Sequence, residues 1–175
     1  MKKGLLFLLF LFGACGVKSE QAPSAPGTLV QAPDGLYEFN LAGEWKEEKG
    51  PNPKIEKIFL NPEGGGRFFI LRIPNPPHQQ IDQSQLTAYV EGLEKRYQNV
   101  QIISQKVNNK YGTSIGGVIF TYEETTPKGP LVLRNFCEIM IHKGNYLNVC
   151  AVAPAALWEK KREQLLGVFP TFKLL

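Results

Sequence analysis

Two cysteines near the C-terminus, Cys137 and Cys150, have the spacing that most clearly suggests chemistry. If Lys143-Gly144 forms a two-residue turn, His142 lies opposite Asn145, and five further residues along each strand bring the two thiols face to face. Opposed residues of an antiparallel ladder lie about 4.5 to 5.5 Å apart at Cα, within the range of a disulfide. We therefore expect a Cys137–Cys150 disulfide, and the alternative is two reduced thiols buried in the core. A catalytic redox pair is not expected, because such pairs usually have the closer CxxC spacing.

The other reactive side chains form no recognisable catalytic or metal-binding set. His78 and His142 are the only histidines, and neither has the spacing of a metal ligand. Glu123 and Glu124 are adjacent on one expected strand, so their side chains point to opposite faces and cannot act as an acid–base pair. Residues 61–66, NPEGGG, lack the Gly-Lys-Ser/Thr ending of a phosphate loop. We expect no catalytic residue, no metal and no cofactor.

A short leader stands at the N-terminus. Lys2 and Lys3 precede eight consecutive apolar residues, 5–12, and small residues follow up to Cys15. This three-part pattern is typical of a secretory signal, and eight apolar residues are too few to span about 30 Å of hydrocarbon. The alternative is that residues 5–12 form a buried strand or helix and Cys15 is a core thiol.

The end of this leader, Phe12-Gly13-Ala14-Cys15, resembles the lipobox of bacterial lipoproteins, with Phe12 where Leu is usual. The resemblance implies that residues 1–14 are a signal peptide and that Cys15 is the lipid attachment site, carrying acyl chains such as palmitate. Each buried methylene then adds about 0.8 kcal/mol to membrane anchoring. Because Gly16 follows the cysteine where Asp signals inner-membrane retention, the resemblance favours the outer membrane, with the chain facing the periplasm. Lipid attachment at Cys15 leaves Cys137 and Cys150 as an even pair, and export to an oxidising compartment supports a disulfide between them.

Composition separates a flexible segment from one folded domain. Residues 15–35 are rich in Pro, Gly, Ser, Ala and Gln without a period of 2 or 3.6, which predicts a flexible, lipid-anchored tether. The rest of the 175-residue chain, 36–175, is long enough for one domain. Two of the four net positive charges lie in the leader, so the domain has little excess charge and nucleic acid is not an expected partner.

The first part of this domain predicts strands followed by a helix. Strands are expected at 36–41, 54–60 and 67–73, the last two joined in a hairpin by the glycine-rich loop 61–66. A helix that Asp82 or Ser84 could cap then follows. Its apolar stripe has the spacing i, i+3, i+4, i+7 and i+11 and comprises Leu86, Tyr89, Val90, Leu93 and Tyr97.

The second part predicts an antiparallel meander and a closing helix. Four strands are expected at 100–107, 115–122, 131–141 and 146–153. The expected turns are Asn108-Asn109, residues 125–130 and Lys143-Gly144, and the closing helix runs from Pro154 to Pro170. Because several strands are apolar on both faces, we expect an α+β fold, an α/β/α sandwich around a mainly antiparallel sheet.

The order of these elements over 36–175 resembles the PsbP-like superfamily, which includes DcrB-type bacterial lipoproteins. The matching segments are IFLNPEGGGRFFILRIP, QLTAYVEGLEKRY, GGVIFTYEE and the closing FPTFKLL. The resemblance implies a PsbP-like fold. It also implies an accessory or protein-binding role, since members of the superfamily mostly lack catalysis.

These observations predict a lipid-anchored, extracytoplasmic binding or accessory protein that is not an enzyme. It would bind the membrane through its N-terminal lipid and engage an envelope protein through the sandwich surface or the loop Pro74–Gln80. The alternative is a carrier that holds a lipid or small apolar ligand in a cavity between sheet and helix. A third hypothesis, a hydrolase, requires a deep polar pocket.

Overall fold

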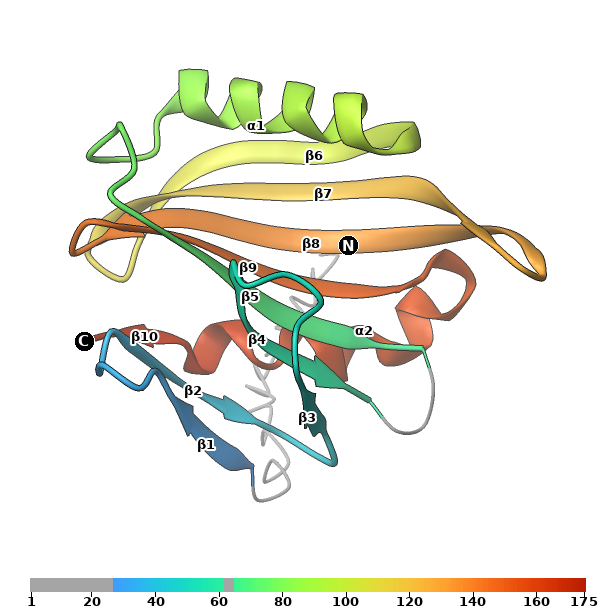
Figure 1. Ribbon diagram of the computed structural model, residues 1–175, viewed down its shortest axis with the longest axis horizontal. Helices are drawn as coiled ribbons and strands as arrows, with labels where there is room; N and C mark the ends of the chain where they lie inside the picture. Colours follow the sequence, from blue (N-terminus) through green and yellow to red (C-terminus); the bar gives the residue numbers. More distant parts are fainter. Residues whose placement is uncertain (1–26, 62–64) are drawn as a thin grey trace, which may run out of the picture.

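A seven-stranded antiparallel sheet forms the centre of the computed structural model, which describes residues 27–61 and 65–175 (Figure 1). The strand order is β3-β4-β5-β9-β8-β7-β6. In chain order these strands are β3 Lys46–Glu48, β4 Ile55–Leu60, β5 Arg67–Pro74, β6 Gln98–Lys110, β7 Thr113–Thr126, β8 Gly129–His142 and β9 Asn145–Pro154. A smaller sheet has the order β1-β2-β10, with β1 Thr28–Gln31, β2 Tyr37–Leu41 and β10 Lys173–Leu174.

The two faces of the large sheet are covered by different elements. Helix α1, Gln83–Arg96, packs on one face with the apolar side chains of β7, β8 and β9. Helix α2, Trp158–Leu166, and the small sheet pack on the other face, together with the 3₁₀ helix η2, Phe169–Thr171. A second 3₁₀ helix, η1, Ala155–Leu157, leads from β9 into α2 and has no buried residue. The predicted α+β fold with two covered sheet faces is confirmed. No helix among the described residues has the length and apolar character needed to cross a membrane.

The hairpin of β8 and β9 has the predicted register. Lys143 and Gly144 form the turn with φ angles of 45° and 69°, in the left-handed region that two-residue hairpin turns need. His142 pairs with Asn145 and Cys137 pairs with Cys150, with 4.2 Å between the cysteine Cα atoms. The two cysteines form a disulfide bond, as predicted.

Helix α1 also begins and lies where the apolar stripe predicts. The Asp82 carboxylate accepts hydrogen bonds from the amides of Ser84 and Gln85, and the Gln85 side chain accepts from the Asp82 amide, which completes a capping box. Leu86 and Leu93 are buried. Gly116 on β7 allows the close approach of the helix, since a Cβ there would lie 2.9 Å from Leu86 Cδ1.

Several sequence predictions require correction. The closing helix predicted from Pro154 to Pro170 is shorter, because only α2, Trp158–Leu166, is α-helical. Another correction concerns the end of the tether. Strand β1 lies inside the segment predicted to be flexible and pairs antiparallel with β2. Val30 is only 8% exposed, and the Ala32 amide donates to Tyr37 O over 3.0 Å, so the ordered chain begins well before Leu36. Cys15, the leader and the first part of the predicted tether lie outside the described residues.

The other two corrections concern turns. Asn108 and Asn109 lie within β6, and the turn to β7 is at Tyr111-Gly112, where both φ angles are positive at 57° and 74°. Residues 125–130 are not an open loop, because β7 continues to Thr126 and pairs there with Gly129 of β8. Strand β6 is also longer than predicted. It borders the large sheet and carries register shifts at Gln98/Gln101 and Ile102/Ser104.

Candidate functional site

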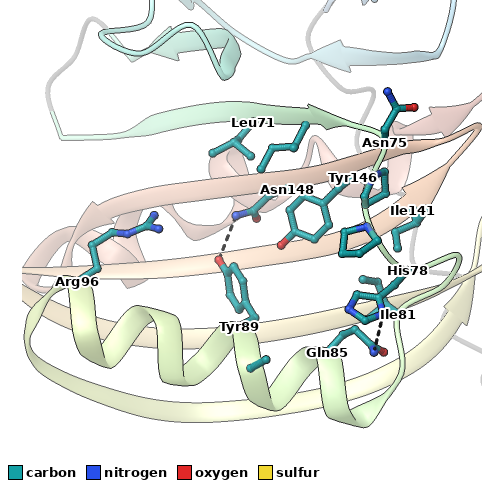
Figure 2. A pocket seen from close by; sticks show the side chains of 14 residues that line it. Leu71, Asn75, His78, Ile81, Gln85, Tyr89, Arg96, Ile141, Tyr146 and Asn148 are labelled. Atoms are coloured by element: carbon teal, nitrogen blue, oxygen red, sulfur yellow. Dashed lines mark hydrogen bonds between the residues drawn. The ribbon is translucent and has the colours of Figure 1, made fainter.

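An open groove lies between helix α1 and the large sheet, with a cavity volume of about 430 Å³ (Figure 2). Helix α1 contacts the border strand β6, so part of the opposite half of the sheet is not covered by it (Figure 1). The groove has α1 as one wall, β5, β8 and β9 as its floor, and the loop that follows β5 as its lip. We call this feature the α1 groove.

The floor of the α1 groove follows from the alternation of side chains along β5. Phe68 and Ile70 point to the α2 side and are 0% exposed. Leu71 and Ile73 line the groove and remain partly exposed. One strand thus supplies the core with one set of residues and the groove with the other.

The lip is the proline-rich loop Pro74–Gln80, of which Pro76, Pro77 and His78 line the groove. Two contacts hold its ends. The Asn75 amide donates to Gly144 O over 2.8 Å, and the Ser114 hydroxyl donates to Ile81 O. Because proline restricts φ, this loop is a relatively stiff edge to the groove.

Two tyrosines provide polar groups in the α1 groove. The Asn148 side-chain amide donates a hydrogen bond of 3.1 Å to the Tyr89 hydroxyl. Burial raises the pKa of Tyr89 to about 12, and burial also raises the pKa of Tyr146 well above its usual range. Both phenols are therefore neutral at physiological pH and can donate hydrogen bonds.

Arg96 lies at the C-terminal end of α1 and lines one end of the groove. Within residues 27–61 and 65–175, no carboxylate forms an ion pair with it, and the groove lining contains no Asp or Glu. Arg96 is exposed, so its guanidinium is accessible from solvent. The groove is therefore mainly apolar with a positive charge at one end.

Of the side chains that sequence reasoning considered for chemistry, the structure brings together the two cysteines and keeps the two histidines apart. Cys137 and Cys150 are buried in the core beneath α1 and do not line the groove. His78 does line it, with its Nδ1 3.4 Å from Gln85 Nε2, whereas the His142 Nε2 lies 3.0 Å from Leu175 O. In the part of the chain that the structure describes, no three His, Cys, Asp or Glu side chains are placed to hold a metal ion.

Sequence reasoning did not identify the residues of the α1 groove. They come from four elements and a loop that are far apart in the chain. Two signals were present, namely the loop Pro74–Gln80 and Tyr89, whose hydroxyl lies on the edge of an otherwise apolar helix stripe. Only the fold brings these two signals together.

Comparison with known proteins identifies the fold. No protein-family model and no curated protein sequence matches the chain. The solution structure of cyanobacterial PsbP from Synechocystis sp. PCC 6803 matches with a TM-score of 0.64 and 12% identity, over 94% of this chain and 99% of that chain. The Saccharomyces cerevisiae Ran-binding protein Mog1p matches with a TM-score of 0.60 and 8% identity, over 86% of this chain and 96% of that chain.

A third similar structure is that of LpqN, described as involved in cell envelope biogenesis of Mycobacterium tuberculosis. It matches with a TM-score of 0.55 and 12% identity, over 84% of this chain and 89% of that chain. At these identities the three likenesses establish a common fold.

Proposed function

We propose that this chain, which has the PsbP-like fold, is a lipid-anchored extracytoplasmic binding protein without catalytic activity, and that the α1 groove holds an apolar ligand. The observation that carries the proposal is the groove itself. Its volume of about 430 Å³ lies within the range of roughly 300 to 1,000 Å³ that ligand sites occupy. Its apolar floor with a few polar groups is the usual composition of such a site.

Binding explains the groove better than catalysis does. A nucleophile needs a base within hydrogen-bond reach, and a third group usually orients that base. In the α1 groove the one hydrogen-bond contact of the His78 imidazole among the described residues is with the Gln85 amide, and both tyrosines are neutral phenols. These side chains can orient a ligand by hydrogen bonding, and none is paired to activate a nucleophile.

The location rests on the leader and on Cys15. We propose that residues 1–14 are removed, that Cys15 is acylated, and that the domain stands on the periplasmic side of a bacterial membrane, the outer membrane where Gly16 directs it. LpqN, which has the same fold, is described as involved in cell envelope biogenesis, and this is consistent with an envelope location.

Metabolic labelling with a palmitate analogue tests the anchor. We expect the full chain to be labelled and to remain with the membrane fraction, and Cys15→Ser to lose both properties. Cys137→Ser is the matched control, because that thiol is engaged in a buried disulfide. Equal labelling of the chain and of Cys15→Ser would contradict the proposal.

Native mass spectrometry of the gently extracted full chain tests the ligand site. We expect a ligand bound in stoichiometric amount to the wild type and absent from Ala88→Trp. Ala88 lines the groove, and a large ring at this position would fill it. Thr87→Trp is the control, since Thr87 is the adjacent exposed residue of α1 and does not line the groove. A bound mass retained in Ala88→Trp would place the ligand elsewhere.

A second candidate function is the binding of an envelope protein through the loop Pro74–Gln80. The observation that favours it is that this loop is mostly exposed although it is fixed at both ends. A pull-down from detergent-solubilised envelope with the full chain tests it. We expect a specific partner that the double variant Pro77→Ala, His78→Ala fails to recover, and recovery of the same proteins by both forms would contradict this function.

A further inference from the structure

We propose that the ligand of the α1 groove is a single-chain amphiphile with an anionic head, and that Arg96 binds that head. This inference rests on the proposed function and specifies its ligand. It follows from the distribution of charge, hydrogen-bond donors and apolar surface along the groove.

The two ends of the groove differ in polarity. Arg96 lies at one end, and Ile81, Ile141 and the proline-rich loop lie at the other (Figure 2). Ile81 and Ile141 are 2% and 7% exposed and form an apolar base at the end opposite Arg96, where the uncharged amides of Asn75 and Gln85 and the His78 ring lie at the rim. A ligand with one charged end and one apolar end matches this arrangement.

The charge at the head end is positive, and the acidic side chains of Glu123 and Glu124 line a separate pocket that Arg96 also borders. The groove lining holds a guanidinium and no carboxylate, and Arg96 forms no ion pair with residues 27–61 or 65–175. An anionic head would satisfy the guanidinium, a cationic head would be repelled, and a neutral head would gain little from it.

Hydrogen-bond donors stand between the two ends. The hydroxyls of Tyr89 and Tyr146 both face the groove between Arg96 and the apolar end (Figure 2). Tyr89 already accepts from Asn148, so its own proton is free to donate to a ligand. Phenol donors beside a guanidinium suit oxygen acceptors such as those of a carboxylate.

The volume favours a slender occupant. About 430 Å³ is near the lower end of the range for ligand sites. A folded protein partner cannot enter such a groove, whereas a single alkyl chain can lie along it with its head at the Arg96 end.

Photo-crosslinking on the intact protein tests this assignment. The full chain is placed in nanodiscs of neutral phosphatidylcholine, and two probes are added separately. One probe is a long-chain carboxylate with a diazirine at its methyl end, and the other is the matching alcohol. We expect the carboxylate to label residues at the Ile81 and Ile141 end of the groove, as mapped by mass spectrometry of peptides.

The variant Arg96→Gln isolates the charge. We expect it to raise the carboxylate concentration needed for half-maximal labelling about fivefold, which corresponds to the loss of an exposed ion pair worth about 1 kcal/mol. The concentration needed for half-maximal labelling by the alcohol should not change. Lys95→Gln is the matched control, because Lys95 is the neighbouring exposed cation of the same helix turn and does not line the groove. It should leave both probes unchanged.

Two results would overturn the inference. The first excludes only the anionic head, and the second also excludes the proposed binding site. If the carboxylate and the alcohol label the groove equally in both the wild type and Arg96→Gln, the anionic head is excluded and the proposed apolar binding site stands. If neither probe labels the groove, or if Ala88→Trp is labelled as strongly as the wild type, the proposed binding site is excluded as well.

Discussion

The two faces of the large sheet differ in how completely they are covered. On the α2 face, aromatic rings from both sheets and from η2 pack against one another, with Phe39 at 5.3 Å from Phe68 and 5.8 Å from Phe172 between ring centroids. On the α1 face, one helix covers part of the sheet and leaves a groove beside it. The α2 face is closed and stabilises the fold, whereas the α1 face has an open groove, which is the proposed ligand site.

Strand β5 contributes side chains to both faces of the sheet. Its even-numbered residues Phe68 and Ile70 are fully buried in the aromatic core, and the odd-numbered Leu71 and Ile73 form the groove floor. Substitutions on the two faces should therefore separate stability from binding, and the predictions below use this separation.

The largest expected effect is on the closed face. Phe39→Ala should lower the free energy of unfolding by about 3 to 5 kcal/mol, because it leaves a cavity among rings that cannot collapse around it. Chemical denaturation followed by circular dichroism measures the change. A loss below about 1 kcal/mol would mean that the aromatic cluster is not the main source of stability.

The next effect concerns the disulfide beneath α1. The double variant Cys137→Ala, Cys150→Ala should lose up to about 3 kcal/mol of stability. The loss stays below this limit because the β8–β9 turn already holds the two strands together without the disulfide. Denaturation of the wild type under reducing conditions should show a similar loss. Equal stability of the oxidised, reduced and substituted chains would show that hairpin pairing alone holds β8 to β9.

The next prediction concerns the contribution of the Tyr89 hydroxyl to stability and the dependence of that contribution on pH. At neutral pH the variant should lose about 1 kcal/mol, because Asn148 is 8% exposed and loses its hydrogen-bond partner. In the wild type the folded pKa of Tyr89, about 12, exceeds the unfolded value of about 10, so its contribution is complete below pH 10 and disappears as pH rises through 12.

Stability measured from pH 9 to 12 tests this sign, with tyrosinate absorbance recorded in parallel. Between about pH 10 and 12 the wild type should lose stability more steeply than Tyr89→Phe. The buried phenol of Tyr146 remains in both forms and serves as the internal reference. Parallel curves would mean that Tyr89 titrates as it does in the unfolded chain.

The smallest effect should come from filling the groove. Ala88→Trp should change the free energy of unfolding by less than about 0.5 kcal/mol, because Ala88 is exposed on α1 and makes no core contact. Thermal and chemical denaturation give the value. A large loss would show that the groove is part of the packed core, and the contrast between the two faces would then fail.

The elements with strong periodicity could be predicted from the sequence. The helix stripe from Leu86 to Tyr97, its cap at Asp82 and the register that opposes Cys137 to Cys150 all follow from local spacing. Local rules were sufficient there because each feature depends on residues close together in the chain.

Short strands and the turn between β6 and β7 could not be predicted in the same way. Strand β1 has four residues, and its stability comes from β2 and the buried Val30, which no local pattern reveals. Asn108 and Asn109 are residue types that favour turns, and this suggested a turn at their position. The turn instead lies at Tyr111-Gly112, because glycine adopts the required positive φ without strain, and β6 continues up to Lys110. The α1 groove depends on long-range contacts and so required the structure.

Strand β6 has a consequence for self-association at high protein concentration. Its outer edge offers unpaired backbone groups along a 13-residue strand, which is a template for joining another copy. The shifts near its start bend that edge, and Lys106 adds an exposed charge to it. Both features hinder neighbouring molecules from merging their sheets into a continuous aggregate.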